Sequence, residues 1–327
     1  MSGLIFAGAG ITRSVPRLAG LALSVALLVV GCGGDEPEPP GRGNDSPSTA
    51  LAEAVGRVAG SGSAPALPIA FSGSEALRRS STFTDPLQPV AGVGLGSLYP
   101  LRQDLPSTTG IDIGRASYAV TAGSAPDAVG LLAGGQDGTV VTSRLLDTGW
   151  EQDGAVLRRP REFSRDVAAT RLGLVLSQVR VTGEDVVYGT MAADLATVQD
   201  TGSPASDLMP LVQCLGEVTA AQIDAPQADD QGARLAAVGV VAPMGGGALR
   251  SILCTTWASA DAATAAAAAQ RQDVMTETVA GGKPYSELLS DATVEDLGGD
   301  GHVVRLTATP NKIELLFTML SRGELPG

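Results

Sequence analysis

Three cysteines and one histidine are the side chains of this 327-residue chain with the widest reactive chemistry. A thiol can be acylated, oxidised to a disulfide or used as a metal ligand, so Cys32, Cys214 and Cys254 are the first candidates. A Ser-His-Asp arrangement would need His302 as its base. His302 follows a glycine-rich turn and precedes two valines, which predicts a histidine at a hairpin edge instead of a catalytic base.

The segment before Cys32 has the composition of an export signal. Residues 1–19 contain no acid and carry Arg13 and Arg17, and an apolar run follows from residue 18 to residue 30. Such a run matches a signal-peptide core in length. It falls short of the ~20 residues that a membrane-spanning helix needs.

The junction Val29-Val30-Gly31-Cys32 resembles the lipobox of bacterial lipoproteins, with two aliphatic residues, a small residue and then cysteine. The resemblance implies that residues 1–31 are a signal peptide, that Cys32 becomes the first residue and that its thiol carries a lipid, with palmitate among the acyl chains. Two acyl chains anchor a protein stably where one is marginal. The implied location is the extracytoplasmic face of the cell membrane. An ordinary secretory signal followed by a chance cysteine is the alternative.

The remaining pair, Cys214 and Cys254, predicts a disulfide, because paired cysteines outside the cytoplasm usually oxidise. Two buried free thiols are the alternative. A metal site is not expected, since a zinc ion needs about four gathered ligands and the chain has one histidine. No cofactor is expected either.

Other motifs give no firm chemistry. Residues 92–96 are glycine-rich, but Ser97 stands where a dinucleotide-binding pattern needs glycine. Adjacent carboxylates such as Asp229-Asp230 and Glu295-Asp296 suit solvated loops and hairpins, because neighbours on a strand point to opposite faces. Trp150 and Trp257 are expected to seal core edges, with ligand stacking as the alternative. The basic stretch 158–165 is a solvated loop or a docking site for an anionic partner.

The net charge of the chain disfavours polyanionic partners. The chain has a formal net charge of −13, and loss of residues 1–31 removes two arginines and no acid, giving −15. Nucleic acid and anionic lipid headgroups would be repelled. With two lysines, many arginines and abundant alanine and glycine, the chain is similar in style to uncharacterised lipoproteins of actinobacterial envelopes, a resemblance that implies no activity.

The elements that must position these residues suggest a tether and one α+β domain. Residues 32–66 are rich in Pro, Gly and polar residues and predict a flexible tether containing a short helix at 49–58. The body, residues 67–327, has mainly antiparallel strands and helices on one face. The expected helices are 74–79, 138–147, 191–198, 205–215, 259–279 and 310–321, and the expected strands are 117–121, 128–133, 155–158, 172–181, 186–189, 218–223, 233–241, 249–257, 294–297 and 302–307.

These elements follow one order twice, which predicts a duplicated unit with halves at about 67–203 and 204–327. The favoured function is a non-catalytic binding or scaffolding module of the cell envelope, with an unidentified envelope protein or lipid as partner. The alternatives are a carrier of a small ligand or lipid, and a hydrolase that uses paired carboxylates.

The lipobox generates one direct prediction. Cys32→Ala is expected to abolish acylation, because the thiol that receives the lipid is gone, while the remaining sequence is unchanged. Metabolic labelling with an alkyne-bearing palmitate, followed by immunoprecipitation, measures this. Label retained on Cys32→Ala would refute the anchor assignment.

Overall fold

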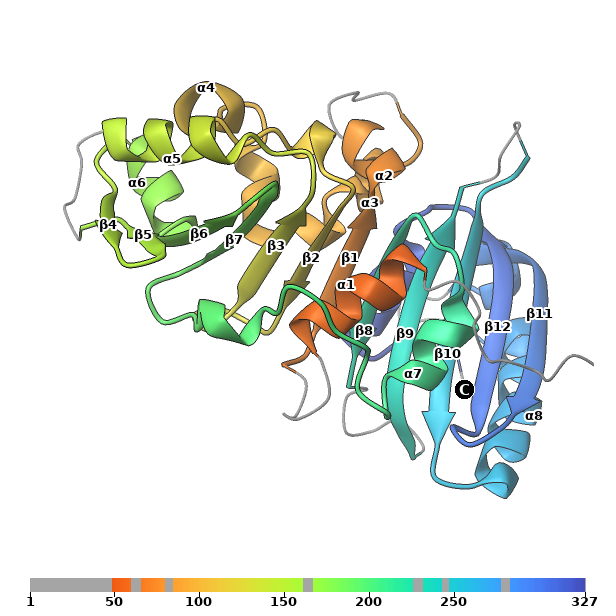
Figure 1. The fold of residues 1–327 in the computed structure, drawn as a ribbon. Coiled ribbons are helices and arrows are strands. Elements are labelled where there is room, and N and C mark those ends of the chain that lie inside the picture. The colour runs from red at the N-terminus through yellow and green to blue at the C-terminus, as the bar shows by residue number, and fades with distance from the viewer. Residues whose placement is uncertain are drawn as a thin grey trace, which may run out of the picture. The chain divides into compact units, whose positions relative to one another are not determined.

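The computed structural model describes residues 49–59, 66–79, 85–160, 167–225, 232–242, 247–277 and 283–326 (Figure 1). The predicted signal peptide, Cys32 and residues 33–48 lie outside these ranges. None of the described helices is long and apolar enough to cross a membrane.

In the described residues, twelve strands form one antiparallel sheet in the order β11-β12-β10-β9-β8-β1-β2-β3-β7-β6-β5-β4. The strands are β1 (Ile69–Gly73), β2 (Tyr118–Ala122), β3 (Val129–Ala133), β4 (Glu151–Asp153), β5 (Val156–Arg158), β6 (Gln178–Thr182), β7 (Asp185–Gly189), β8 (Ala220–Asp224), β9 (Ala233–Val241), β10 (Arg250–Trp257), β11 (Leu289–Gly298) and β12 (Val303–Pro310).

Ten α-helices and three short 3₁₀ segments are present in the described chain. The α-helices are α1 (Ala50–Val58), α2 (Ser74–Arg79), α3 (Gln88–Ala91), α4 (Leu105–Thr109), α5 (Gly138–Asp147), α6 (Val167–Val175), α7 (Met209–Leu215), α8 (Ala260–Thr276), α9 (Tyr285–Leu288) and α10 (Leu315–Arg322). The 3₁₀ segments are η1 (Val93–Leu101), η2 (Ile113–Arg115) and η3 (Leu195–Thr197). The α+β class predicted from the sequence is confirmed.

The sheet repeats one topology in two halves. From the centre outwards, the second half runs β8-β9-β10-β12-β11 and the first half runs β1-β2-β3-β7-β6, with the β4-β5 hairpin added at its edge. The halves meet where β1 pairs antiparallel with β8, with Ile69 opposite Ile223. Because equivalent strands pair antiparallel, the two topologies are related by an approximate twofold axis. The predicted boundary near residue 203 falls between η3 and α7.

Helices cover both faces of the sheet, so the prediction of helices on one face is wrong. Along β10, Cys254 packs in a core with α1 and α7, whereas its neighbour Leu253 packs in a core with α10. In Figure 1, α1 and α7 lie in front of the sheet and α8 lies behind it. The physical reason is that consecutive strand residues are buried, as Val186, Val187 and Tyr188 are, and apolar groups on both faces need cover.

The folded body begins at Thr49, and the prediction that residues 32–66 form a tether is therefore wrong for α1. Its apolar residues Leu51, Val55 and Val58 recur at helical spacing and are buried in the core. The Thr49 hydroxyl caps the helix by accepting a hydrogen bond from the Ala52 amide (3.1 Å). The short helix expected at 49–58 is present, but it is part of the domain.

Three further expectations differ from the structure. Residues 172–175 belong to α6, because a short apolar run does not distinguish a buried strand from a buried helix. Residues 191–198 form turns and η3 in place of a helix. Pro310 ends β12, and the closing helix α10 starts at Leu315.

The glycine-rich stretch at 92–96 has a structural role. A Cβ at Gly94 would collide with the main chain of β1 and β2, and the Gly94 amide donates to the Ser72 hydroxyl (2.9 Å). Glycine is needed there because backbones cross closely.

A buried ion pair holds α1 to the sheet. Arg57 on α1 is almost fully buried, and its guanidinium contacts the Asp185 carboxylate on β7 at 2.7 Å. Its Nε also donates to the carbonyl of Gln199 (2.9 Å). The other Asp185 oxygen accepts from the Gly134 amide (2.7 Å), so both oxygens are satisfied.

Tyr118 on β2 joins this network. Its hydroxyl accepts from Arg57 (3.4 Å) and donates to Glu53 (3.0 Å). Burial raises the pKa of Tyr118 to about 12 against the opposing effect of Arg57. Burial by itself lowers the pKa of Arg57, but hydrogen bonds to Tyr118 and Asp185 outweigh it and raise that pKa above its ordinary value. Both groups therefore keep their protonated forms at neutral pH.

Replacement of Arg57 tests this attachment. Arg57→Met is expected to lower the free energy of unfolding by about 3 kcal/mol, because it leaves the Asp185 carboxylate without its charged partner. Urea denaturation of the purified domain measures the loss, and Arg57→Met combined with Asp185→Asn should recover part of it. Arg158→Met is the control, because the Arg158–Asp153 pair is exposed and should contribute less than about 1 kcal/mol. Equal losses in the two single variants would contradict the assignment.

Candidate functional site

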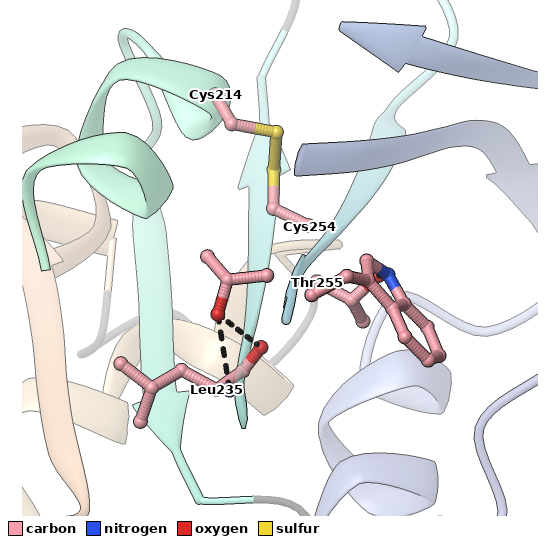
Figure 2. Close-up of a disulfide and its surroundings, with 6 residues drawn as sticks. Cys214, Leu235, Cys254 and Thr255 are labelled. Carbon is pink, nitrogen blue, oxygen red and sulfur yellow. Dashed lines mark hydrogen bonds between the residues drawn. A yellow bond between two sulfur atoms is a disulfide. The ribbon is translucent and has the colours of Figure 1, made fainter. Parts of the chain in front are cut away.

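The predicted disulfide is present between Cys214 on α7 and Cys254 on β10, with the sulfur atoms 1.98 Å apart. Figure 2 shows the bond joining the helix to the strand beneath it. Both residues are buried. Beside them, the Trp257 indole donates to the Thr255 hydroxyl (3.0 Å), which satisfies the polar end of a buried ring.

The disulfide and the Arg57 ion pair occupy equivalent places in the two halves. The buried positions of α1 recur 157 residues later in and just before α7: Leu51 with Leu208, Ala54 with Leu211, Val55 with Val212, Arg57 with Cys214 and Val58 with Leu215. The same helical position therefore binds the helix to the sheet twice, once by charge and once by a covalent bond.

A groove opens beside this disulfide, between α7 and the turn that joins β11 to β12. Its volume is about 430 Å³. The lining includes apolar side chains, the exposed polar side chain of Gln213 and the main chain of the glycine-rich turn: Ser206, Met209, Pro210, Gln213, Cys214, Leu297, Gly298, Gly299, Asp300, Gly301 and Val303. Leu297, with 45 % of its surface exposed, is one of the large apolar side chains that the described chain presents to solvent.

A shallower hollow of about 640 Å³ lies between α5 and the β6–β7 hairpin. Its lining is small and uncharged: Gly138, Thr139, Thr142, Ser143, Leu146, Val181 and Gly183. No ionisable side chain contributes to the lining of this hollow, so it offers hydrogen-bonding hydroxyls and one exposed leucine.

His302 lies in the turn between β11 and β12, with φ of 45°. Its carbonyl accepts from the Trp257 amide (3.2 Å), so its main chain helps to close the end of the sheet. This placement agrees with the predicted hairpin-edge histidine.

Both tryptophans are buried at element boundaries, as predicted. The Trp150 indole donates to the carbonyl of Leu176 (2.8 Å), and the Arg159 guanidinium lies 4.5 Å from its ring centroid. Arg159 is thus engaged in a cation–π contact, and Arg158 pairs with Asp153 at 2.9 Å. Arg161 and Arg165 lie outside the described residues.

The carboxylate pair Glu295-Asp296 lies on β11, where adjacent side chains face opposite sides. Asp296 accepts a hydrogen bond from the Thr264 hydroxyl of α8 (2.8 Å), and Glu295 is opposite Arg305 on β12. The pair Asp229-Asp230 lies outside the described chain. Among the residues that are described, no group of three or more His, Cys, Asp or Glu side chains could hold a metal ion.

The sequence predicted the disulfide pair, but not the Arg57–Asp185 pair or the groove. The apolar spacing of Leu51, Ala54, Val55 and Val58 could have indicated that α1 is part of the core. The partner of Arg57 lies 128 residues away, and nothing local identifies it.

Comparison with known proteins gives little. No protein-family model matches the chain, and no curated protein matches it. The crystal structure of TP0453 (crystal form I) is similar over 83 % of this chain and 98 % of that one, with a TM-score of 0.42 and 11 % sequence identity.

Loss of the disulfide should weaken the body. Cys214→Ala combined with Cys254→Ala is expected to lower the unfolding free energy by about 4 kcal/mol on the chain-entropy model for a loop of this length, 40 residues. Urea denaturation with and without reductant measures the effect, and reductant should not change the double variant further. Two free thiols in the denatured, unreduced body would contradict the pairing.

Proposed function

We propose that this chain is an extracytoplasmic lipoprotein, held to the membrane by a lipid on Cys32, whose body is a non-catalytic binding or scaffolding module of the cell envelope. The observation that carries the proposal is the placement of the three cysteines. Cys214 and Cys254 are joined within the body, which suits an oxidising compartment. Cys32 is then the remaining thiol, and it stands in the lipobox-like junction.

The length of sequence between Cys32 and the body supports the same proposal. Sixteen residues, 33–48, separate Cys32 from Thr49, where the described fold begins, and the seventeen steps along the chain reach at most about 60 Å. The body would work close to the membrane surface. Its net negative charge favours contact with proteins or neutral groups over contact with anionic headgroups.

A second candidate function, carriage of a small ligand or lipid, is favoured by the groove beside α7. Its volume of about 430 Å³ falls within the range of about 300–1,000 Å³ that is usual for small-molecule sites. Native mass spectrometry of the protein purified from its own membrane tests this function. A stoichiometric bound lipid would support carriage, and a protein with only its covalent lipid would argue against it.

The binding proposal is tested by crosslinking in intact cells, followed by purification of the tagged chain. The expected result is a discrete envelope component recovered in near-stoichiometric amount. The matched control is residues 1–48 fused to an unrelated soluble domain, which carries the same anchor without the body. If nothing is enriched over that control, the body is not a binding module.

A further inference from the structure

The approximate symmetry of the two halves breaks down on the face that carries α1 and α7. In the first half, residues 190–205 return from β7 across this face and run beside α1. Ala193, Leu195 and Val198 of this covering segment are buried in the α1/α7 core. In the second half, the chain leaves β12 for the opposite face, where Leu316, Phe317 and Leu320 of α10 pack.

Polar side chains of the sheet hold the covering segment by its main chain. The Gln178 amide on β6 donates to the carbonyls of Thr190, Met191 and Ala193, each at 3.0 Å. The Arg180 guanidinium donates to the carbonyl of Val198 (2.7 Å). A side-chain amide and a guanidinium thus supply the donors that an added stretch of backbone needs.

The covering segment then lies against α1 itself. Arg57 donates to the carbonyl of Gln199, and the Gln199 amide donates back to the carbonyl of Arg57 (2.9 Å each). Gly202 approaches so closely that a Cβ at Gly56 would collide with its carbonyl. This part of the first half is therefore filled by an irregular stretch of the same chain, made of turns and η3.

The equivalent space in the second half is the groove beside α7. Gln213 and Cys214 stand at the helical positions of Gly56 and Arg57, and Val303 begins β12 as Asp185 begins β7. After β12 the chain turns to the opposite face, and no described residue of the second half covers this groove. Its apolar lining includes Val303, Leu297 and Cys214 of the disulfide.

The donors beside this groove include one without a partner. Arg305 lies on β12, two residues beyond Val303 and hence on the same face of the sheet. Its Nε is buried and has no hydrogen-bond partner in the part of the chain that the structure describes. A buried donor left unsatisfied is costly, and an added backbone carbonyl would satisfy it. The Gln213 side chain is exposed, and its amide group offers a second hydrogen-bond donor beside the groove.

We infer that the groove beside α7 docks an irregular polypeptide segment of a partner protein, which lies along α7 and β12 as residues 190–205 lie along α1 and β7. The segment presents small aliphatic side chains to Val303 and the disulfide, and backbone carbonyls to Arg305 and Gln213. It carries no acid, because Asp300 and Glu295 lie on this side of the sheet. This inference rests on the proposed binding function and specifies the surface and the kind of partner.

The test uses a peptide taken from the chain's own covering segment. The probe is fluorescein-labelled residues 190–203 with Asp194→Asn and Asp200→Asn, which removes its acids. Fluorescence anisotropy is measured against the chain 32–327 carrying Cys32→Ser, with a scrambled peptide as the negative control. The expected result is saturable binding of the probe but not of the scrambled peptide. The absence of saturable binding would overturn the inference.

Variants localise the binding. Leu297→Asp and Gln213→Ala change exposed residues that line the groove and should each weaken binding by about fivefold or more, because each removes a side chain that contacts the segment. Leu174→Asp is the matched control, because Leu174 is 61 % exposed on α6, away from the groove, and it should leave binding unchanged. Binding that all three variants leave intact, or that Leu174→Asp weakens equally, would place the peptide elsewhere and overturn the inference.

A fluorescent fatty acid, dansyl-undecanoic acid, distinguishes the other occupant. If it binds, if Leu297→Asp weakens that binding and if the peptide does not bind, the groove is a small-amphiphile site and the peptide inference is wrong. The crosslinking test of the proposed function does not use the peptide. Recovery of an envelope partner together with failure of the peptide would therefore reject only this docking mode.

Discussion

Burial of the sheet on both faces is the constraint on which the rest of the structure depends. All five residues of β3 are buried. Alternate residues of β3 and β10 pack in the core shared with α1 and α7, and the residues between them pack in a separate core on the opposite face, one for each half. A sheet of this kind cannot leave either face to water, so helices or chain segments must cover both. This requirement explains why α1, immediately after the proposed tether, is packed into the domain. It also explains why residues 190–205 follow an irregular path over β6 and β7. The corresponding surface beside α7 is an exception, because no described segment covers it.

The two halves meet the requirement by different chemistry at one helical position. In the first half, Arg57 reaches Asp185 and Tyr118 in a network that leaves each charged group with a partner. In the second half, Cys214 and Cys254 replace charge by a covalent bond. A buried ion pair tolerates no loss of one partner, whereas a disulfide depends on an oxidising surrounding. The first half is therefore independent of redox conditions, and the second half is sensitive to them. The residues of α7 form no ion pair in the described structure. Without the disulfide, the attachment of α7 to the sheet would therefore depend on apolar contacts.

The sequence predicted those features that local patterns encode. The alanine-rich helix α8, the glycine-rich turn between β11 and β12, the α+β class and the cysteine pair follow from propensity, turn chemistry and cysteine counting. It failed where long-range packing decides. Residues 172–175 are equally apolar as strand or helix, and only the packing of α6 selects the helix. Residues 191–198 have helical composition, but Gln178 and Arg180 bind their carbonyls and keep them from pairing within a helix. The groove depends on where the chain does not return after β12, which no short stretch of sequence records.

The position of α1 also gives the domain a defined direction of mechanical loading. If the chain is held through Cys32 as proposed, any pull between the membrane and the body enters at Thr49, the N-cap of α1. The Arg57 ion pair lies at the opposite end of that helix, eight residues further on. Tension would peel the apolar first turns away from β1 and β2 before it reached the ion pair. Arg57 would then be the last strong contact of α1 to break, and its rupture would uncover the core that α1 shares with α7, while the disulfide kept α7 attached to β10.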